Sequence, residues 1–494
     1  MDILLIVFLA LFTFATRVIN LLKIPIFTDE AIYIRWAQIG LADPAQRYIS
    51  LSDGKQPLLT WLMYPLLMVF KDPLLAGRFV SVLSSVLAVI GIYLLAKTLF
   101  NRRAAVAAGL LYIISAFTLV YDRLALMDSL LANFAVWSLY LQVLQVKYLR
   151  LDIALLSGIT FGLGLMTKSS AMFFLYLLPA SLLLFNFRAK DAGKNLLRWI
   201  SLSLLSTIIA LIMYNSLRLS PLFYIIEQKN YSFIISFSEF IQNPFRYFLP
   251  NLYGLMTFLS GYLTIPVLIL VVVNLGICLI KKDNQVLLLF LWFAVPFLAL
   301  AGFGKVLFPR FILFMSLPLL LIAGSLLGDL YYFAQTKMKF IYLVIFLTII
   351  IPLYNSIVLL TNPVEAKIPL NDRNQLFDDW PSGYGVREVI SFLEKEAENS
   401  KIVIGTEGTF GLNPAVYEIY LGKNKNVVIR GYWPVNSVPK ELIDYADKYP
   451  TYLVFKEKQQ IPGNWPLKLI AKYRRGLGNT YLYFYRVIPE NGSN

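Results

Sequence analysis

Apolar runs of about twenty residues recur along this chain, and they limit its fold more than any other feature. The hydrocarbon core of a bilayer is about 30 Å thick, so a helix that crosses it needs about twenty mostly apolar residues. Of the 494 residues, 58% are hydrophobic and only 15% are charged. A soluble protein of this size needs a far more polar surface. The sequence therefore predicts a polytopic α-helical membrane protein.

About eleven runs are predicted to be membrane spans. They cover residues 3–22, 74–98, 104–120, 129–146, 152–167, 171–186, 199–218, 257–280, 285–302, 309–328 and 340–360. The first run lacks a basic N-terminal region and a small-residue cleavage site, so it is interpreted as a span and not as a cleaved signal. Residues 219–256 mix aromatic and isolated polar residues, which is typical of interfacial helix and a mobile flap.

Basic residues in alternate connections predict the orientation in the membrane. Short cytoplasmic loops carry an excess of lysine and arginine. Here such loops contain the 188–198 segment and Arg102, Arg103, Lys147, Arg150, Lys281, Lys282, Lys337 and Lys339. We therefore expect a cytoplasmic N-terminus, with residues 24–72, 219–256 and 362–494 on the outer side. Positive-inside topology is the first explanation of the net charge of +15, and attraction to anionic lipid or a phosphate-bearing substrate is a second.

Residues 362–494 differ in character, because charge rises and the apolar runs shorten. Helical periodicity is predicted over 385–398, 414–421 and 440–448. Strands are predicted at 401–405, 427–432, 451–455, 467–473 and 481–487. The sequence thus predicts two domains: a transmembrane domain over residues 1–361 and a small extracytoplasmic α/β domain over residues 362–494. The loop at 406–411 matches neither phosphate-binding fingerprint, so no nucleotide is assigned to it.

The chain contains no histidine, and its single cysteine, Cys278, lies within an apolar run. Histidine is the commonest metal ligand and the commonest general base near neutral pH. Proton transfer in this chain therefore depends on carboxylates, and any metal site would have oxygen ligands only.

Charged side chains recur at the predicted outer ends of the spans. Asp29 and Glu30 lie side by side after the first span, and the other connections add Arg35, Lys55, Asp122, Arg123, Asp128, Lys168, Lys305 and Arg310. One interpretation is a single polar cavity at the outer boundary, and the other is a solvated rim of helix ends. For Asp29 and Glu30 the structural alternative is an acidic first helical turn that Thr28 caps.

Several motifs in this order resemble the GT-C glycosyltransferases, above all protein O-mannosyltransferases and the bacterial lipid-A aminoarabinose transferase. The opening motifs are Thr28-Asp29-Glu30-Ala31 and Gly54-Lys55-Gln56-Pro57-Leu58-Leu59. Four later stretches also fit: residues 76–81, 122–128, 162–168 and 308–311. The resemblance covers most of residues 1–330. Gln56 departs from the family, since many relatives have proline there.

The resemblance implies transfer of a sugar from a polyprenyl-phosphate donor to an acceptor hydroxyl outside the cytoplasmic membrane, with inversion. The family's base maps to Asp29, its lysine to Lys55, and the aspartate that begins its fourth span to Asp128. Relatives use a histidine near a metal, and because this chain has none we predict no metal and no other cofactor. The expected partners are the lipid-linked donor, a protein, lipid or glycan acceptor, and membrane lipids, but no nucleic acid.

The chemistry of inverting transfer gives roles to the same residues. A base must take the proton of the acceptor hydroxyl, and cations must stabilise the charge that grows on the departing phosphate. The predicted catalytic group is Asp29, Glu30 and Asp128, where Asp29 is the base and Glu30 is expected to hold a nearby cation or backbone amide. Asp128 is expected to orient Arg123 or the acceptor. The predicted phosphate ligands are Lys55, Arg123, Lys168 and Arg310.

Two other functions share part of this pattern. A lipid-linked glycan ligase or polymerase has the same location and donor type but moves a glycan as one block. A polyprenyl-lipid flippase or transporter places its charged site near the bilayer midplane, whereas the charges of this chain lie at span ends.

Overall fold

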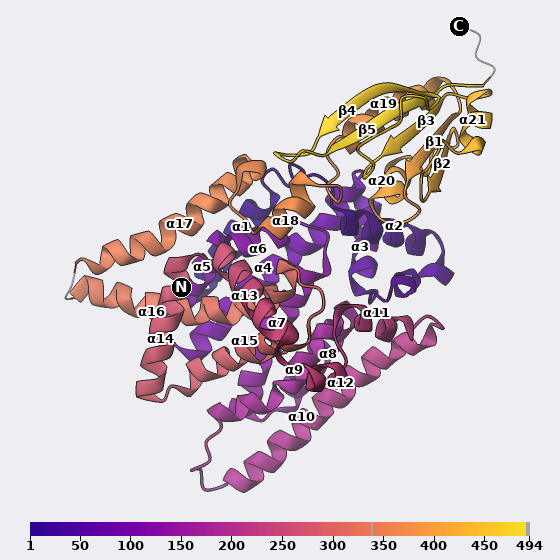
Figure 1. Ribbon diagram of the computed structural model, residues 1–494. Coiled ribbons are helices and arrows are strands. Elements are labelled where there is room, and N and C mark those ends of the chain that lie inside the picture. Colours follow the sequence, from indigo (N-terminus) through magenta and orange to yellow (C-terminus); the bar gives the residue numbers. More distant parts are fainter. Residues whose placement is uncertain (337–338, 491–494) are drawn as a thin grey trace. The chain divides into compact units, whose positions relative to one another are not determined.

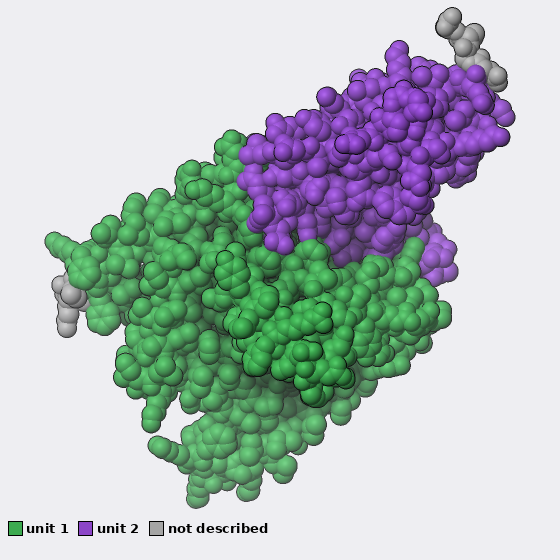
Figure 2. Space-filling view, viewed as in Figure 1, with its two compact units in different colours: residues 1–20, 48–62, 79–369 green, residues 21–47, 63–78, 370–494 purple. Residues whose placement is uncertain are grey.

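The computed structural model describes residues 1–336 and 339–490 (Figure 1). The chain forms two compact units, which Figure 2 shows in green and purple. The first, here called the membrane unit, contains residues 1–20, 48–62 and 79–369. The second, here called the sheet unit, contains residues 21–47, 63–78 and 370–494. The predicted C-terminal domain thus shares a compact unit with two segments from the beginning of the chain.

The chain up to residue 361 is helical. Its α-helices are α1 (Asp2–Val18), α2 (Thr28–Ala42), α3 (Leu58–Val69), α4 (Pro73–Leu99), α5 (Arg102–Ile114), α6 (Ala116–Tyr121), α7 (Met127–Tyr148), α8 (Leu151–Thr167), α9 (Met172–Tyr176), α10 (Ala192–Asn215), α11 (Ile225–Phe233), α12 (Phe237–Gln242), α13 (Phe245–Leu263), α14 (Ile265–Lys281), α15 (Asn284–Phe303), α16 (Leu313–Thr336) and α17 (Ile341–Thr361). Two short 3-10 helices lie at predicted phosphate ligands. Helix η2 (Ile49–Asp53) precedes Lys55, and helix η6 (Pro309–Ile312) contains Arg310.

The prediction of a polytopic helical membrane protein is confirmed, but the count of eleven spans is not. Over residues 1–336 and 339–490, six helices are long and apolar enough to cross a membrane. The number of candidate spans is seven if the bent pair α13 and α14 forms one further span. The six helices are α4, α7, α10, α15, α16 and α17. Other predicted spans correspond to shorter helices, such as α1 with 17 residues and α5 with 13. Lys337, one of the predicted cytoplasmic basic residues, lies outside the described residues.

The span predicted at 257–280 is not one straight helix, because the chain bends sharply inside it. Helices α13 and α14 meet at an angle of 110°. Thr264 at the bend has a φ of +66°, and Pro266 lies in the first turn of α14. Proline has no N–H to continue the ladder of the preceding helix, and its ring clashes with that helix. An unbroken apolar run concealed this break.

Small residues let helices of the membrane unit approach closely. Gly324 and Gly328 of α16 lie against Ala108 and Ala104 of α5, and a Cβ on Gly324 would lie 2.7 Å from the Cα of Ala108. Without a strong hydrophobic drive between helices in lipid, such close backbone packing is a main source of helix association.

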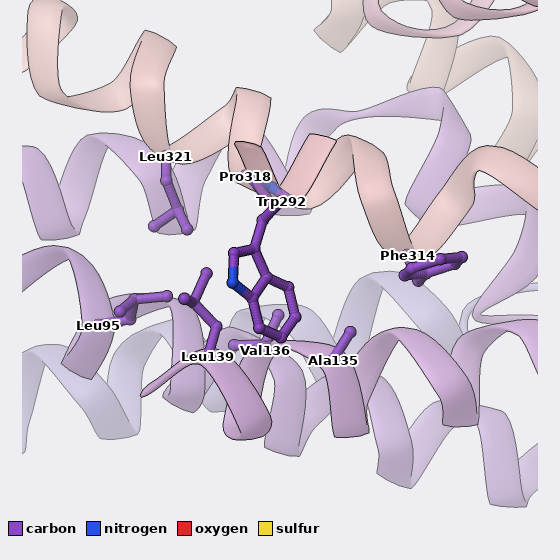
Figure 3. Close-up of a pocket in the computed structure, with 8 residues that line it drawn as sticks. All are labelled: Leu95, Ala135, Val136, Leu139, Trp292, Phe314, Pro318 and Leu321. Atoms are coloured by element: carbon purple, nitrogen blue, oxygen red, sulfur yellow. The ribbon is translucent and has the colours of Figure 1, made fainter. Parts of the chain in front are cut away.

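A gap in the membrane unit is lined by apolar side chains of four helices (Figure 3). In this view the indole of Trp292, from α15, lies among side chains of α4, α7 and α16. Its lining residues are Leu95, Ala135, Val136, Leu139, Trp292, Phe314, Pro318 and Leu321. Because none of these side chains titrates near neutral pH, we interpret the gap as a feature of helix packing.

The sheet unit contains the predicted α/β domain. Its strands are β1 (Ile402–Glu407), β2 (Val427–Tyr432), β3 (Thr451–Phe455), β4 (Leu467–Arg474) and β5 (Tyr481–Val487), in the order β2-β1-β3-β5-β4. Strand β1 is parallel to β2 and β3, whereas β5 is antiparallel to β3 and β4. Helices α18 (Leu370–Arg373), α19 (Val386–Asn399), α20 (Leu412–Leu421) and α21 (Lys440–Ala446) complete the domain.

Alternating residues of the strands build two apolar layers. Val403, Leu453 and Phe455 pack with Leu442 of α21 on one face. On the other face, Phe392 of α19 contacts the rings of Tyr452 and Phe484. Successive side chains of a strand point to opposite faces, so a sheet between two helical layers is the expected result. The predicted strands and helices of this domain are confirmed to within two residues at nearly every end.

Candidate functional site

Three of the predicted phosphate ligands lie on one group of phenylalanine rings in the membrane unit. The ammonium nitrogen of Lys55 is 5.2 Å from the ring centre of Phe233, and that of Lys168 is 4.7 Å from the ring centre of Phe311. The guanidinium carbon of Arg310 lies 4.6 Å from the centre of Phe308. We call this group the cation–phenylalanine cluster; it comprises Lys55, Lys168, Phe233, Phe308, Arg310 and Phe311.

The three rings connect the cations to one another. The ring centre of Phe311 lies 6.1 Å from that of Phe233 and 5.5 Å from that of Phe308. All three cations are partly buried. A cation over an aromatic face is attracted by the ring quadrupole, and the interaction strengthens when water is excluded. The rings therefore help to hold the three cations in place, and the cluster gathers three positively charged side chains in one part of the membrane unit.

Asp128 supplies a carboxylate to this cluster. Its Oδ1 lies 2.6 Å from the Nζ of Lys168, and the side chain of Asp128 is buried. Lys168 immediately follows the last residue of α8, where a cation also meets the negative end of the helix dipole. Asp128 was expected to orient Arg123 or the acceptor; the ion pair that it forms is with Lys168.

The loop that carries Lys55 is attached to two other segments of the membrane unit. Asp53 forms an ion pair with Lys229 of α11. Gly54 has a φ of +65°, and a Cβ there would lie 2.5 Å from the Cβ of Lys229. The side chain of Gln56 donates a hydrogen bond of 2.8 Å to the Oγ of Ser169, next to Lys168. These contacts bring loop 53–56, the end of α8 and helix α11 together around the cluster.

Asp29 and Glu30 lie in the sheet unit, in the first turn of α2. Glu30 is fully buried, and its two carboxylate oxygens each accept a hydrogen bond of 2.8 Å from Arg78. One of them also accepts from the backbone N–H of Phe27. Glu30 therefore does hold a cation and a backbone amide, which supports a structural role and not a catalytic one. Asp29 is partly exposed.

The capping role considered for Thr28 is wrong. Residue Phe27 occupies the N-cap position, and Thr28 is the first residue of the helix. The hydroxyl of Thr28 donates to the carbonyl of Pro381 instead. Glu30 satisfies the N-cap backbone from the N3 position, as in half of a capping box.

Arg123 has contacts that differ from those expected of a phosphate ligand. It is 1% exposed, and its Nη2 donates to the carbonyls of Ile19 and Asn20 at 2.8 and 2.7 Å. These carbonyls follow the end of α1, where helix C-termini lack intrahelical partners. Arg123 therefore holds the backbone that follows α1, and its predicted role as a phosphate ligand stays a prediction.

Asp122, the residue before Arg123, belongs to a buried network that the sequence interpretation missed. Arg17 of α1 donates to Asp122 at 3.2 Å and to backbone carbonyls of Tyr112 and Ile113. Asp122 also accepts from the hydroxyls of Tyr112 and Ser129. An arginine inside an apolar run was the available signal, because intramembrane ionisable residues need partners.

Within residues 1–336 and 339–490, no three side chains of the kinds that bind metals come together. That no metal or other cofactor takes part stays a prediction.

Comparisons with known proteins agree with this fold. The family model of dolichyl-phosphate-mannose-protein mannosyltransferases matches residues 54–215, which include Lys55, Asp128 and Lys168. A search of curated protein sequences gave no match.

Solved structures match over nearly the whole chain. ArnT from Cupriavidus metallidurans in the apo state matches with a TM-score of 0.59 and 16% identity, over 98% of this chain and 97% of ArnT. The same protein bound to undecaprenyl phosphate matches with a TM-score of 0.54 and 13% identity, over 100% of this chain and 99% of ArnT. The Archaeoglobus fulgidus oligosaccharyltransferase in the apo form gives 0.56 and 15%, over 92% of this chain and 69% of that chain.

These matches define the class of fold. The chain is a multi-pass membrane protein with the GT-C fold. It is similar in sequence to the mannosyltransferase family over residues 54–215 and similar in structure to ArnT throughout.

Proposed function

We propose that this protein transfers a sugar from a polyprenyl-phosphate donor to an acceptor hydroxyl, with inversion, on the outer face of the cytoplasmic membrane. The observation that carries the proposal is the cation–phenylalanine cluster, in which three partly buried cations surround connected aromatic rings. The family model that covers Lys55, Asp128 and Lys168, and the fold shared with ArnT, support it. Neither the sugar nor the acceptor is assigned.

The cluster would bind the phosphate of the donor. Arg310 can hold two phosphate oxygens through parallel hydrogen bonds, whereas Lys55 and Lys168 act as point charges. When the bond between the sugar and the phosphate oxygen breaks, its electrons stay with the phosphate, whose negative charge increases. Fixed cations aimed at this charge lower the barrier most when water is excluded. Asp128 keeps the ammonium of Lys168 in place.

Asp29 would act as the general base. Its carboxylate takes the proton of the acceptor hydroxyl, the oxygen attacks the anomeric carbon on the face opposite the phosphate, and polyprenyl phosphate leaves. Neighbouring positions on a helix point about 100° apart, so Asp29 and Glu30 do not face one hydroxyl. The burial of Glu30 against Arg78 leaves Asp29 as the accessible acid of this pair.

The test is turnover by purified protein in nanodiscs with radiolabelled polyprenyl-phosphate sugars and membrane extract as acceptor. Asp29→Asn keeps the size of the side chain and removes its basicity, so turnover should fall by about 10²–10⁴-fold. Glu394→Gln, an exposed acid on α19 of the same unit, is the matched control and should stay near the wild-type rate. If the Asp29→Asn protein keeps the wild-type turnover and melting temperature, Asp29 is not the base and has only a structural role at the start of the helix.

Transfer of a whole glycan is the second candidate. The match to the archaeal oligosaccharyltransferase over 92% of this chain favours it. Paired assays with donors that carry one sugar or a short oligosaccharide separate the two activities. Faster transfer of the oligosaccharide would replace the single-sugar proposal.

A further inference from the structure

Helix α2, which carries Asp29, is held from one side by Arg78 of α4. This guanidinium is fully buried and donates to both oxygens of Glu30. Its remaining hydrogen bonds go to the carbonyls of Leu21, Ile24 and Pro25, at 2.7, 2.9 and 3.0 Å. The chain that leads into α2 therefore wraps around a single side chain, and Glu30 is its anionic contact.

The C-terminal domain makes a second set of contacts with the start of α2. The backbone N–H and the hydroxyl of Thr28 both donate to the carbonyl of Pro381. Phe27 pairs with Ser382 as in an antiparallel bridge, and the N–H of Gly383 donates to Ile26 at 2.8 Å. Residues on both sides of Asp29 are thus bonded to fixed partners.

Further along α2, helix α20 of the same domain adds specific contacts. Arg35 forms an ion pair of 2.8 Å with Glu418, and the side chain of Gln38 donates to the carbonyl of Ile419. The ring of Trp36 lies 6.1 Å from that of Phe410, on the loop after β1. All of these residues belong to the sheet unit.

We infer that the C-terminal domain is a positioning element for Asp29: together with Arg78 it fixes α2, so that the carboxylate is held in one orientation toward the acceptor hydroxyl. The inference rests on the proposed role of Asp29 as base. A misplacement of about 1 Å in a reacting group can cost about 10²-fold in rate, so contacts remote from the chemistry are expected to appear in kcat.

The experiment compares charge variants across the α2–α20 contact. Arg35→Glu and Glu418→Arg should each lower kcat by about 10-fold or more and leave the KM for the donor unchanged. The double variant restores an ion pair with the charges exchanged and should recover most of kcat. Single variants with wild-type kcat, or a double variant no better than the singles, would overturn the inference.

Arg78→Lys tests the contacts of α2 with Arg78, because lysine keeps the charge and loses the planar fork. The matched control is Arg475→Lys, since Arg475 is also a fully buried arginine of the sheet unit and donates to the carbonyls of Lys456 and Tyr481. Arg78→Lys should lose kcat, and Arg475→Lys should lose only melting temperature. Equal loss of kcat in both would assign the effect to general destabilisation and refute positioning.

A readout that needs no activity separates this inference from the proposed function. Hydrogen exchange of residues 26–34, followed by mass spectrometry, should accelerate in Arg35→Glu and Arg78→Lys and recover in the charge-exchanged double variant. If wild-type protein transfers no sugar while this pattern holds, the proposed function fails and the positioning contacts stand. If wild-type protein is active while exchange is unchanged in all variants, the positioning inference fails alone.

Discussion

Gly54→Ala tests whether the loop before Lys55 must follow its observed path. Alanine at a φ of +65° takes the left-handed conformation, which costs about 1–2 kcal/mol. Its Cβ would also lie 2.5 Å from the Cβ of Lys229 and 2.8 Å from the carbonyl oxygen of Ile225. Overpacking of this kind costs about 1–3 kcal/mol. The two effects together give about 2–5 kcal/mol, which a shift of loop 53–56 away from α11 would relieve.

This shift should move Lys55 away from Phe233 and weaken donor binding. We expect the Kd for polyprenyl phosphate in nanodiscs to rise by about tenfold or more, which corresponds to at least about 1.4 kcal/mol. Gly193→Ala is the matched control: this glycine is the second residue of α10, with nothing within 4 Å of an added Cβ, and alanine there should leave the Kd at the wild-type value. Gly54→Ala protein with wild-type affinity and melting temperature would show that the loop is not held by these contacts.

Three more predictions follow from the same contacts. Asp128→Asn should release the ammonium of Lys168 and lower kcat by about tenfold. The control Asp152→Asn, at an exposed ion pair with Arg150, should leave kcat near the wild-type value. Equal kcat values in the two variants would show that Asp128 is not part of the site. Arg17→Met leaves Asp122 buried without its cation, so the protein should lose about 3–5 kcal/mol of stability and its melting temperature should fall strongly. The double variant with Asp122→Asn should regain much of the melting temperature. An Arg17→Met protein with the wild-type melting temperature would contradict the network. A periplasm-only reporter fused after Val487 should be active, because the basic loops place residues 362–494 outside; signal from a cytoplasm-only reporter would reverse the topology.

The C-terminal domain could be predicted from the sequence because its patterns are local. The buried strand at 402–407 and the amphipathic helix at 386–399 each show their own periodicity, and the Gly476 turn separates the last two strands. The membrane helices were recognised by their apolar content, but their ends and breaks were not. The bend at Thr264 lies inside a continuous apolar run, where hydropathy does not change.

Residue type and motif order predict which residues belong to the candidate site, but they do not predict which side chains contact one another. Lys55, Lys168 and Arg310 are far apart in sequence, and only the fold shows that phenylalanine rings connect them. Arg78 lies within the motif at residues 76–81, but nothing in the local sequence indicates that its partner is Glu30, 48 residues earlier. The same holds for Lys229, which meets Asp53 across 176 residues.

The measurement that tests the central claim most directly is equilibrium binding of polyprenyl phosphate to protein in nanodiscs, compared among lysine variants. Lys55→Ala should raise the Kd by about tenfold or more, and Lys55→Arg should recover part of the affinity because the charge is kept. Lys194→Ala, at a largely exposed lysine on α10, should bind as the wild type does. Wild-type affinity in Lys55→Ala protein that melts normally would contradict the assignment of the cation–phenylalanine cluster to the donor phosphate.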